Sequence, residues 1–101
     1  MSQSHDELLD SMTGLAASLS ALHLQAAREL APVVQSLIAT HSRDVSRIEH
    51  TLDRLLDCAC RSDGLVLFKS LCRHYYSLAP QAAAEYVMIY RNTWEEKEVQ
   101  P

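Results

Sequence analysis

The residues with the clearest capacity for chemistry are three cysteines and a histidine. Cys58 and Cys60 are followed by Cys72 and His74, and three thiolates with one imidazole form a known tetrahedral zinc site. The spacing opposes this use, because residues two apart on a helix point about 200° apart. If two helices pack antiparallel about a turn near residue 62, Cys72 also lies about 7 Å further along the axis than Cys58. The sequence therefore favours buried packing cysteines, with a thiol and histidine metal site as an alternative.

The five histidines do not form a metal-binding or catalytic motif. No two of them are four residues apart, which excludes a two-histidine site on one helix face and a His-Glu-x-x-His motif. The sequence also lacks a glycine-rich phosphate loop and a nucleophile elbow, and it has few of the loops that usually carry active sites. We therefore expect a non-enzymatic protein without catalytic residues, without a metal site and without a cofactor.

Basic side chains offer a second chemistry, the binding of phosphate groups. Lys69, Arg73, His74 and Arg91 lie on two consecutive predicted helices joined by a short turn, as in a helix-turn-helix. The second of these helices begins with Pro-Gln-Ala-Ala-Ala-Glu at residues 80–85. That start offers one amide and one carboxylate, whereas a recognition helix presents several polar side chains to base edges. A small DNA-associated transcriptional regulator therefore remains an alternative function.

The six aromatic residues are confined to the segment from Phe68 to Trp94. Tyr86, Tyr90 and Trp94 are spaced four apart, so on a helix they form one continuous aromatic ridge. Aromatic side chains carry large burial energies and are enriched where proteins meet. The ridge is therefore predicted to anchor a protein interface. The expected neighbours of the ridge at this interface are Tyr76, Met88 and Ile89.

The middle of the same helix, residues 82–90, is apolar on almost every side, and Glu85 alone is clearly suited to solvent. Such a helix needs cover on both faces, and a chain of 101 residues is too short to surround it. A second copy is the simplest cover, because two-fold dimers are the commonest oligomers. We expect a protein–protein interaction or adaptor module that binds itself as a homodimer, or another protein, through this helix. Cover by the chain's own long helices is the alternative.

Composition and periodicity indicate that helices position all of these side chains. The chain has 2 Gly and 3 Pro, too few for a hairpin-rich β fold, and its 48% hydrophobic and 22% charged residues are typical of a globular domain. An apolar stripe from Leu8 to Ala59 covers 51 residues in 14 steps of about 3.64, the period of a straight helix. The sequence predicts an all-α, compact bundle that forms a single domain over residues 1–101.

The predicted bundle has four main helices, at about residues 5–30, 32–60, 63–77 and 80–96. Pro32 is expected to kink or break the first helix near Leu30, because a proline in a helix interior costs about 3 kcal/mol. A second interruption is predicted at residues 41–43, where Ser and Asp can cap a new helix. The turn at residues 61–64 and Pro80 separate the remaining helices.

The net charge of −4 is unevenly distributed along the chain. Residues 1–60 carry −4, residues 61–94 carry +2 and the last seven carry −2. A surplus of two positive charges is too small to indicate nucleic-acid binding by itself. The acidic start is unlike a targeting leader, no apolar run approaches a membrane span, and three cysteines suit a reducing compartment. We expect a cytoplasmic protein without membrane contact, whose residues 97–101 form a disordered tail.

Overall fold

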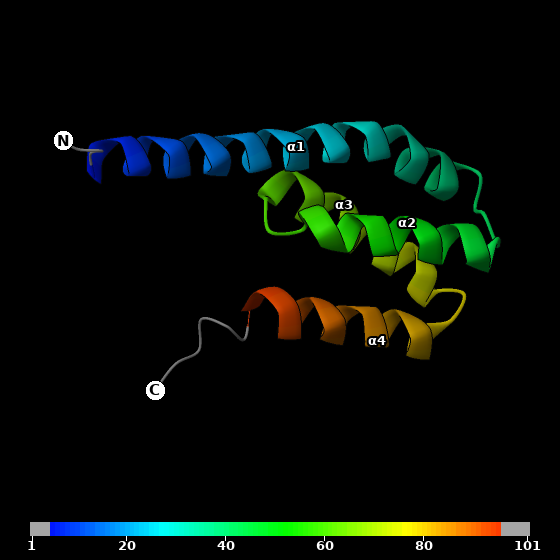
Figure 1. Ribbon diagram of the computed structural model, residues 1–101. Helices are drawn as coiled ribbons and strands as arrows, with labels where there is room; N and C mark the ends of the chain where they lie inside the picture. Colours follow the sequence, from blue (N-terminus) through cyan, green and yellow to red (C-terminus); the bar gives the residue numbers. More distant parts are fainter. Residues whose placement is uncertain (1–4, 96–101) are drawn as a thin grey trace.

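The computed structural model describes residues 5–95, with the side chains of 14–15 and 17–94. These residues form four α-helices and a final π-helical turn, without a strand (Figure 1). The elements are α1 (His5–Ala39), α2 (Val45–Cys58), α3 (Ser62–Tyr76), α4 (Pro80–Tyr90) and the turn η1 (Arg91–Glu95). The predicted all-α bundle is thereby confirmed. The predicted end of the last helix at residue 96 and the predicted tail at 97–101 lie outside the described residues.

The first helix differs from its predicted length. The break predicted near Leu30 does not occur, because α1 continues through Pro32 to Ala39. Pro32 lies on the exposed side of the helix, while Leu30 and Val34 are buried in the core. Packing of this face against α2 and α3 maintains the helix in spite of the hydrogen bond that Pro32 cannot donate.

The interruption predicted at residues 41–43 is the one that separates α1 from α2. The backbone N–H groups of His41 and Ser42 donate to the carbonyls of Ile38 and Leu37, 3.1 and 2.9 Å away. His41 has a φ of 53°, the left-handed conformation that glycine usually adopts at a helix end. Asp44 then caps α2, because its carboxylate accepts the backbone N–H of the third helical residue.

The helix α3 contacts α1, α2 and α4, and in Figure 1 it lies between α1 and α4. Its buried side chains Phe68, Leu71 and Tyr75 are at most 2% exposed. Because one helix contacts the other three, its sequence determines how all of them are spaced. The apolar residues that complete the core from the other helices are Leu30, Val34, Leu37, Ile48, Leu52, Leu55 and Ala83.

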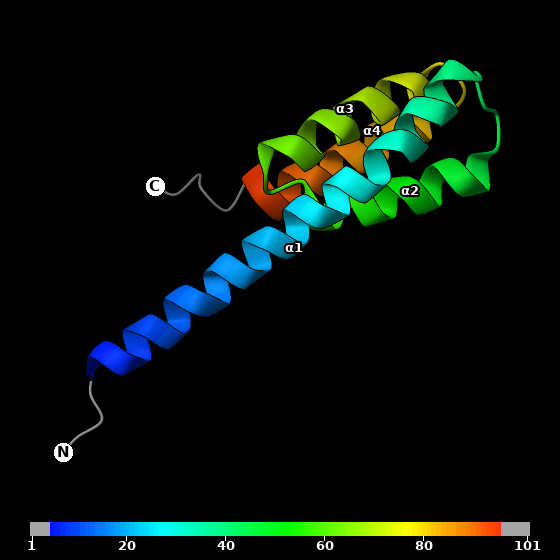
Figure 2. The same cartoon turned by 90° about the horizontal axis from the view of Figure 1, so that it is seen from above.

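The first part of α1 projects beyond the end of the bundle (Figures 1 and 2). Here Leu15, Leu19 and Leu22 are 66, 55 and 59% exposed, whereas Ala27 and Leu30 are buried. The apolar stripe of the sequence therefore continues onto helix that no other described element covers. Despite its length, α1 is not apolar enough to cross a membrane, and neither is any other described helix.

We expect Pro32→Ala to stabilise the fold by about 1 to 3 kcal/mol, because alanine restores a backbone hydrogen bond inside α1 at an exposed position. Urea unfolding followed by circular dichroism measures this change. Gln35→Ala, one turn further along the exposed side, is the matched control and should change stability by less than about 0.5 kcal/mol. A loss of stability in Pro32→Ala would contradict the interpretation that core packing alone maintains the helix at this point.

The two glycines give opposite predictions. A Cβ atom added at buried Gly64 would lie 2.8 Å from the carbonyl carbon of Cys58 and 2.9 Å from its Sγ, closer than real Cβ contacts. Gly64→Ala is therefore expected to cost about 1 to 3 kcal/mol by forcing α2 and α3 apart. Nothing lies within 4 Å of a Cβ at Gly14, so Gly14→Ala should be neutral or stabilising by up to about 1 kcal/mol. Equal effects of the two substitutions on stability in chemical denaturation would disprove the close approach of α2 and α3 at Gly64.

Candidate interaction surface

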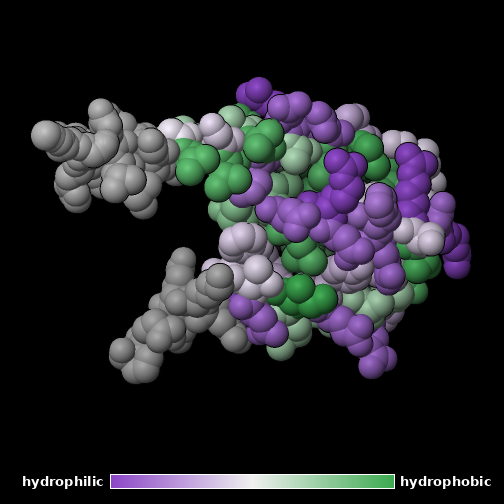
Figure 3. All heavy atoms as spheres, viewed as in Figure 1, coloured by the Kyte–Doolittle hydropathy of each residue, from purple (hydrophilic) through white to green (hydrophobic). Residues whose placement is uncertain are grey.

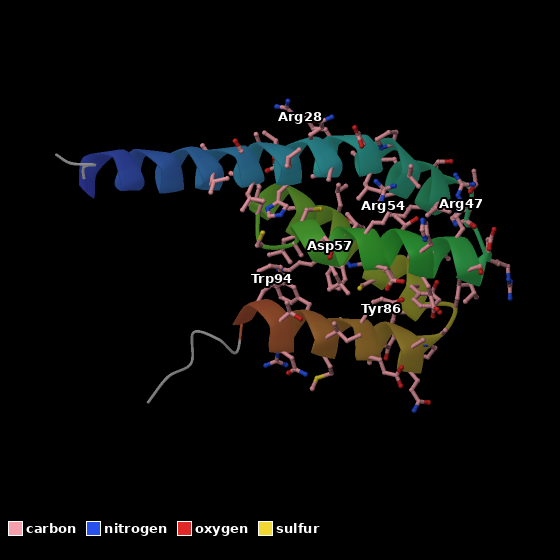
Figure 4. All side chains as sticks on the ribbon, viewed as in Figure 1. Arg28, Arg47, Arg54, Asp57, Tyr86 and Trp94 are labelled. Atoms are coloured by element: carbon pink, nitrogen blue, oxygen red, sulfur yellow. The ribbon has the colours of Figure 1, made fainter. Side chains whose placement is uncertain are left out.

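The aromatic ridge of Tyr86, Tyr90 and Trp94 turns toward the chain's own helices and is half-buried. Figure 4 shows Tyr86 and Trp94 pointing from the last part of the chain toward α2. The Tyr86 hydroxyl donates to Oδ1 of Asp53 at 2.9 Å. The Trp94 indole N–H donates to the carbonyl oxygen of Leu56 at 3.0 Å. Both ends of the ridge are thus hydrogen-bonded to α2.

Ring packing completes the attachment of α4. The rings of Tyr90 and Phe68 have centroids 5.7 Å apart, and Tyr86 meets Tyr75 edge-on at 6.5 Å. Such pairs contribute about 0.5 to 1.5 kcal/mol beyond the burial of their surface. The ridge points toward the chain's own helices, because α2 supplies acceptors for its polar atoms and α3 supplies rings. Contact of a partner with the exposed parts of the ridge stays a prediction.

Two tyrosine and carboxylate pairs connect α2 to its neighbours. The hydroxyl of Tyr75, a residue that is 1% exposed, donates to Oε2 of Glu49 at 2.5 Å. Burial, and then the bond to Glu49, raise the pKa of Tyr75 to about 12. Burial and the bond to Asp53 raise the pKa of Tyr86 as well. Both phenols therefore stay protonated and act as hydrogen-bond donors to α2 at neutral pH.

An open groove of about 690 Å³ lies between α3 and α4, on the edge of α4 away from the ridge's contacts with α2. Buried Phe68 and Ala83 form its floor, and exposed Tyr76, Val87 and Met88 line its edges. The groove is therefore predominantly apolar. The described residues that line it are Leu65, Phe68, Lys69, Cys72, Arg73, Tyr76, Ala83, Ala84, Val87, Met88, Tyr90 and Arg91.

Three basic residues, Lys69, Arg73 and Arg91, line this groove, and within residues 17–94, whose side chains the structure describes, none of the lining residues is acidic. The structure thus brings together two sets of candidates that the sequence kept apart, the interface residues and the phosphate-binding residues. Lys69, Arg73 and Tyr76 are four and three positions apart on α3, a spacing that places them on one helix face. That spacing was visible in the sequence, whereas the alignment of this face with Val87 depends on how α3 and α4 pack.

Four of the predicted site residues do not line the groove: Tyr86 and Trp94, which are bonded to α2, and His74 and Ile89. The ring of His74 is half-buried, and its Nε2 is 2.8 Å from the carbonyl oxygen of Ser42. His74 therefore connects α3 to the turn between α1 and α2 and is not grouped with the three cations. Ile89 is exposed on α4, but it does not line the groove.

The cysteines do not converge on a common point. Cys58 and Cys72 are buried, and burial raises the pKa of both thiols, that of Cys72 to about 11. A raised pKa disfavours the thiolate that a metal ion requires. The exposed Cys60 has its Sγ 3.6 Å from Nδ1 of His23. Within the described part of the chain, no three His, Cys, Asp or Glu residues are grouped around a position for one ion.

Comparisons of this chain with protein-family models, with curated proteins and with solved structures find no match. The groove must therefore be interpreted from its own geometry and charge. Both features, an apolar floor and basic residues on its lining, are properties of a binding surface.

The stability of the fold should fall between pH 10 and pH 12. The unfolded chain releases the Tyr75 proton near pH 10 and the folded chain near pH 12. Between these values only the folded state holds the proton, so the free energy of unfolding falls by up to about 1.4 kcal/mol per pH unit. Tyr75→Phe removes this contribution and makes the slope shallower, while the raised pKa of Tyr86 keeps a fall of the same sign. Urea unfolding at pH 8 to 12 measures it. Tyr76→Phe alters an exposed tyrosine, and its stability should fall as steeply with rising pH as that of the wild type. An equally steep fall in Tyr75→Phe would contradict the assignment of the slope to Tyr75.

Proposed function

We propose that this protein is a non-enzymatic protein–protein interaction module whose α3–α4 groove binds an amphipathic helix of another protein, with acidic side chains beside the helix's apolar face. The observation that carries the proposal is the groove itself, an apolar channel that, among the described residues, is lined by three basic side chains and by no acidic one. Insertion of an amphipathic helix into an apolar groove is a recurrent mode of recognition.

The dimensions of the groove suit a short helical segment. Its volume of about 690 Å³ is comparable with that of established ligand pockets. The helix α4 has 11 residues and is therefore about 16 Å long, which corresponds to three turns of a partner helix. Three turns present two or three apolar anchors at i, i+3 or i+4, and i+7. Exposed Val87 and Met88 would be covered by these anchors.

The charge distribution favours an acidic partner at this place. The chain carries −4 overall, so acidic segments are repelled by most of its surface and attracted where Lys69, Arg73 and Arg91 gather. Charges at the edge of an interface mainly accelerate association and select orientation, whereas buried apolar anchors supply most of the affinity. Salt should therefore weaken binding only moderately.

Two other occupants compete for the same part of the molecule. A homodimer through α4, as expected from the sequence, would use exposed Met88 and Ile89 on the outer side of that helix. Nucleic acid would use Lys69, Arg73 and Arg91, but the apolar floor between these residues offers no partner to phosphate oxygens. The groove is better matched by an amphipathic helix, and the experiment below separates the three.

We expect a synthetic 18-residue helical peptide with a leucine face and flanking glutamates to bind at micromolar concentration. Its counterpart with lysines in place of glutamates should bind at least about tenfold more weakly, because it is repelled by the basic lining. Titration calorimetry gives the affinities. Backbone amide shifts in the ¹⁵N-labelled protein locate the site, and they should cluster on α3 and α4 around Arg73 and Val87.

Matched variants on α4 test the position of the site. Met88→Asp should reduce peptide binding at least about tenfold, because the aspartate places a repelling charge at an apolar edge of the groove. Ile89→Asp changes the neighbouring exposed residue outside the groove and should leave binding intact. Equal binding of both peptides, or an equal loss of peptide affinity in both variants, would refute the proposal that the groove is the binding site. Salt-sensitive binding of duplex DNA in place of peptide would favour the nucleic-acid alternative.

A further inference from the structure

We infer that the projecting part of α1 pairs antiparallel with the same segment of a second copy of this chain, which gives a two-fold dimer centred near Ala17. This inference concerns a surface separate from the α3–α4 groove, because no described side chain of α1 lines that groove. The pairing covers the exposed side chains of Leu15, Leu19 and Leu22.

The projecting helix is apolar and uncharged over an unusual length. From Ser11 to Ala27 the sequence contains no Asp, Glu, Lys or Arg. In Figure 3 apolar residues gather on the coloured part of α1 beside the bundle, whereas much of the visible face of the bundle is hydrophilic. A single helix with Gly14 in its interior and no packed face is marginally stable in water. A helix partner of similar apolar character removes this weakness by covering the leucines.

The spacing of the apolar positions is the same in both directions along the helix. It advances by 4, 3, 4, 3 and 4 residues and is symmetric about residue 17. When two copies run antiparallel about this point, position 15 of one copy lies opposite position 19 of the other. A two-fold interface requires such self-complementarity, and alternate steps of three and four form the seam of a two-helix coiled coil. The six positions of the pattern are Leu8, Met12, Leu15, Leu19, Leu22 and Ala26, and the last of these also packs against the chain's own core.

Charge selects the antiparallel arrangement over the parallel one. The sequence places Asp6, Glu7 and Asp10 in the first two turns of α1. A parallel pair would put two such acidic ends side by side, which is repulsive. In the antiparallel pair the two acidic ends are far apart, and each lies near Arg28 and Glu29 of the other copy, whose charges cancel. The helix dipoles are then also opposed, which is favourable.

The test is the mass of the full chain in solution. Sedimentation equilibrium at about 10 to 100 μM should give twice the monomer mass of 11.3 kDa. The double variant Leu15→Glu with Leu19→Glu should sediment as a monomer, because it places charges in the seam. Ala17→Glu, on the opposite side of the same exposed helix, is the matched control and should remain dimeric. Circular dichroism confirms that each variant keeps the helical bundle.

Three results would overturn the inference: a monomeric wild type at 100 μM, a dimer that survives the double leucine variant, or equal dissociation by Ala17→Glu. Met88→Asp provides a separate control, because it should abolish peptide binding in the groove and leave the dimer mass unchanged. Dissociation by Met88→Asp would assign the dimer to α4 instead. The leucine variant should in turn keep its affinity for the acidic peptide, so that failure of either proposal is recognised independently.

Spin labels measure the orientation of the two helices. In a Cys60→Ser background, where Cys58 and Cys72 are buried, single cysteines are introduced at Ser18 and at Gln25. An antiparallel pair centred at residue 17 offsets the two labels along the axis by about 3 Å at position 18 and about 24 Å at position 25. A parallel pair gives similar distances at both positions. Similar distances would refute the antiparallel arrangement even if the chain is dimeric.

Discussion

The attachment of α4 along one aromatic edge is the constraint on which the exposed surface of this protein depends. The helix has a single buried residue, Ala83, so the core alone does not determine its orientation. The hydrogen bonds of Tyr86 and Trp94 to α2 do so, because a partly buried phenol or indole that lacks an acceptor is costly. Because this edge of α4 faces α2, the apolar side chains on the opposite edge of α4 remain exposed at the surface.

The groove follows from that orientation. The central helix α3 presents one face to the core and a neighbouring face, which includes Lys69, Arg73 and Tyr76, to the space beside α4. The same rotation of α4 that buries the ridge brings Val87 and Met88 to this space. Packing inside the monomer and the proposed recognition of a helical partner are thus two consequences of one arrangement. A change at Asp53 of α2, whose carboxylate accepts the Tyr86 hydroxyl, would alter the groove without touching it.

The two exposed apolar regions differ in the partner they suit. The projecting leucines of α1 lie in an uncharged stretch, whereas the α3–α4 groove is lined by cations within an acidic chain. A neutral, symmetric stripe is matched by its own copy, and a basic groove by an acidic segment. Two chains paired through α1 would carry two grooves, so a partner with two acidic helices would gain affinity from simultaneous binding.

The local sequence pattern was sufficient to predict the helical class and the existence of the aromatic ridge. It also predicted the bounds of α3 and the start of α4 to within one residue. All of these depend on near neighbours in the chain. The local pattern was insufficient at Pro32, where burial of Leu30 and Val34 outweighs the local preference of proline. It was insufficient again for the ridge, whose spacing predicts a continuous face but not its direction. That direction depends on Asp53 and Leu56, more than thirty residues away, and therefore only tertiary packing decides which apolar residues remain exposed.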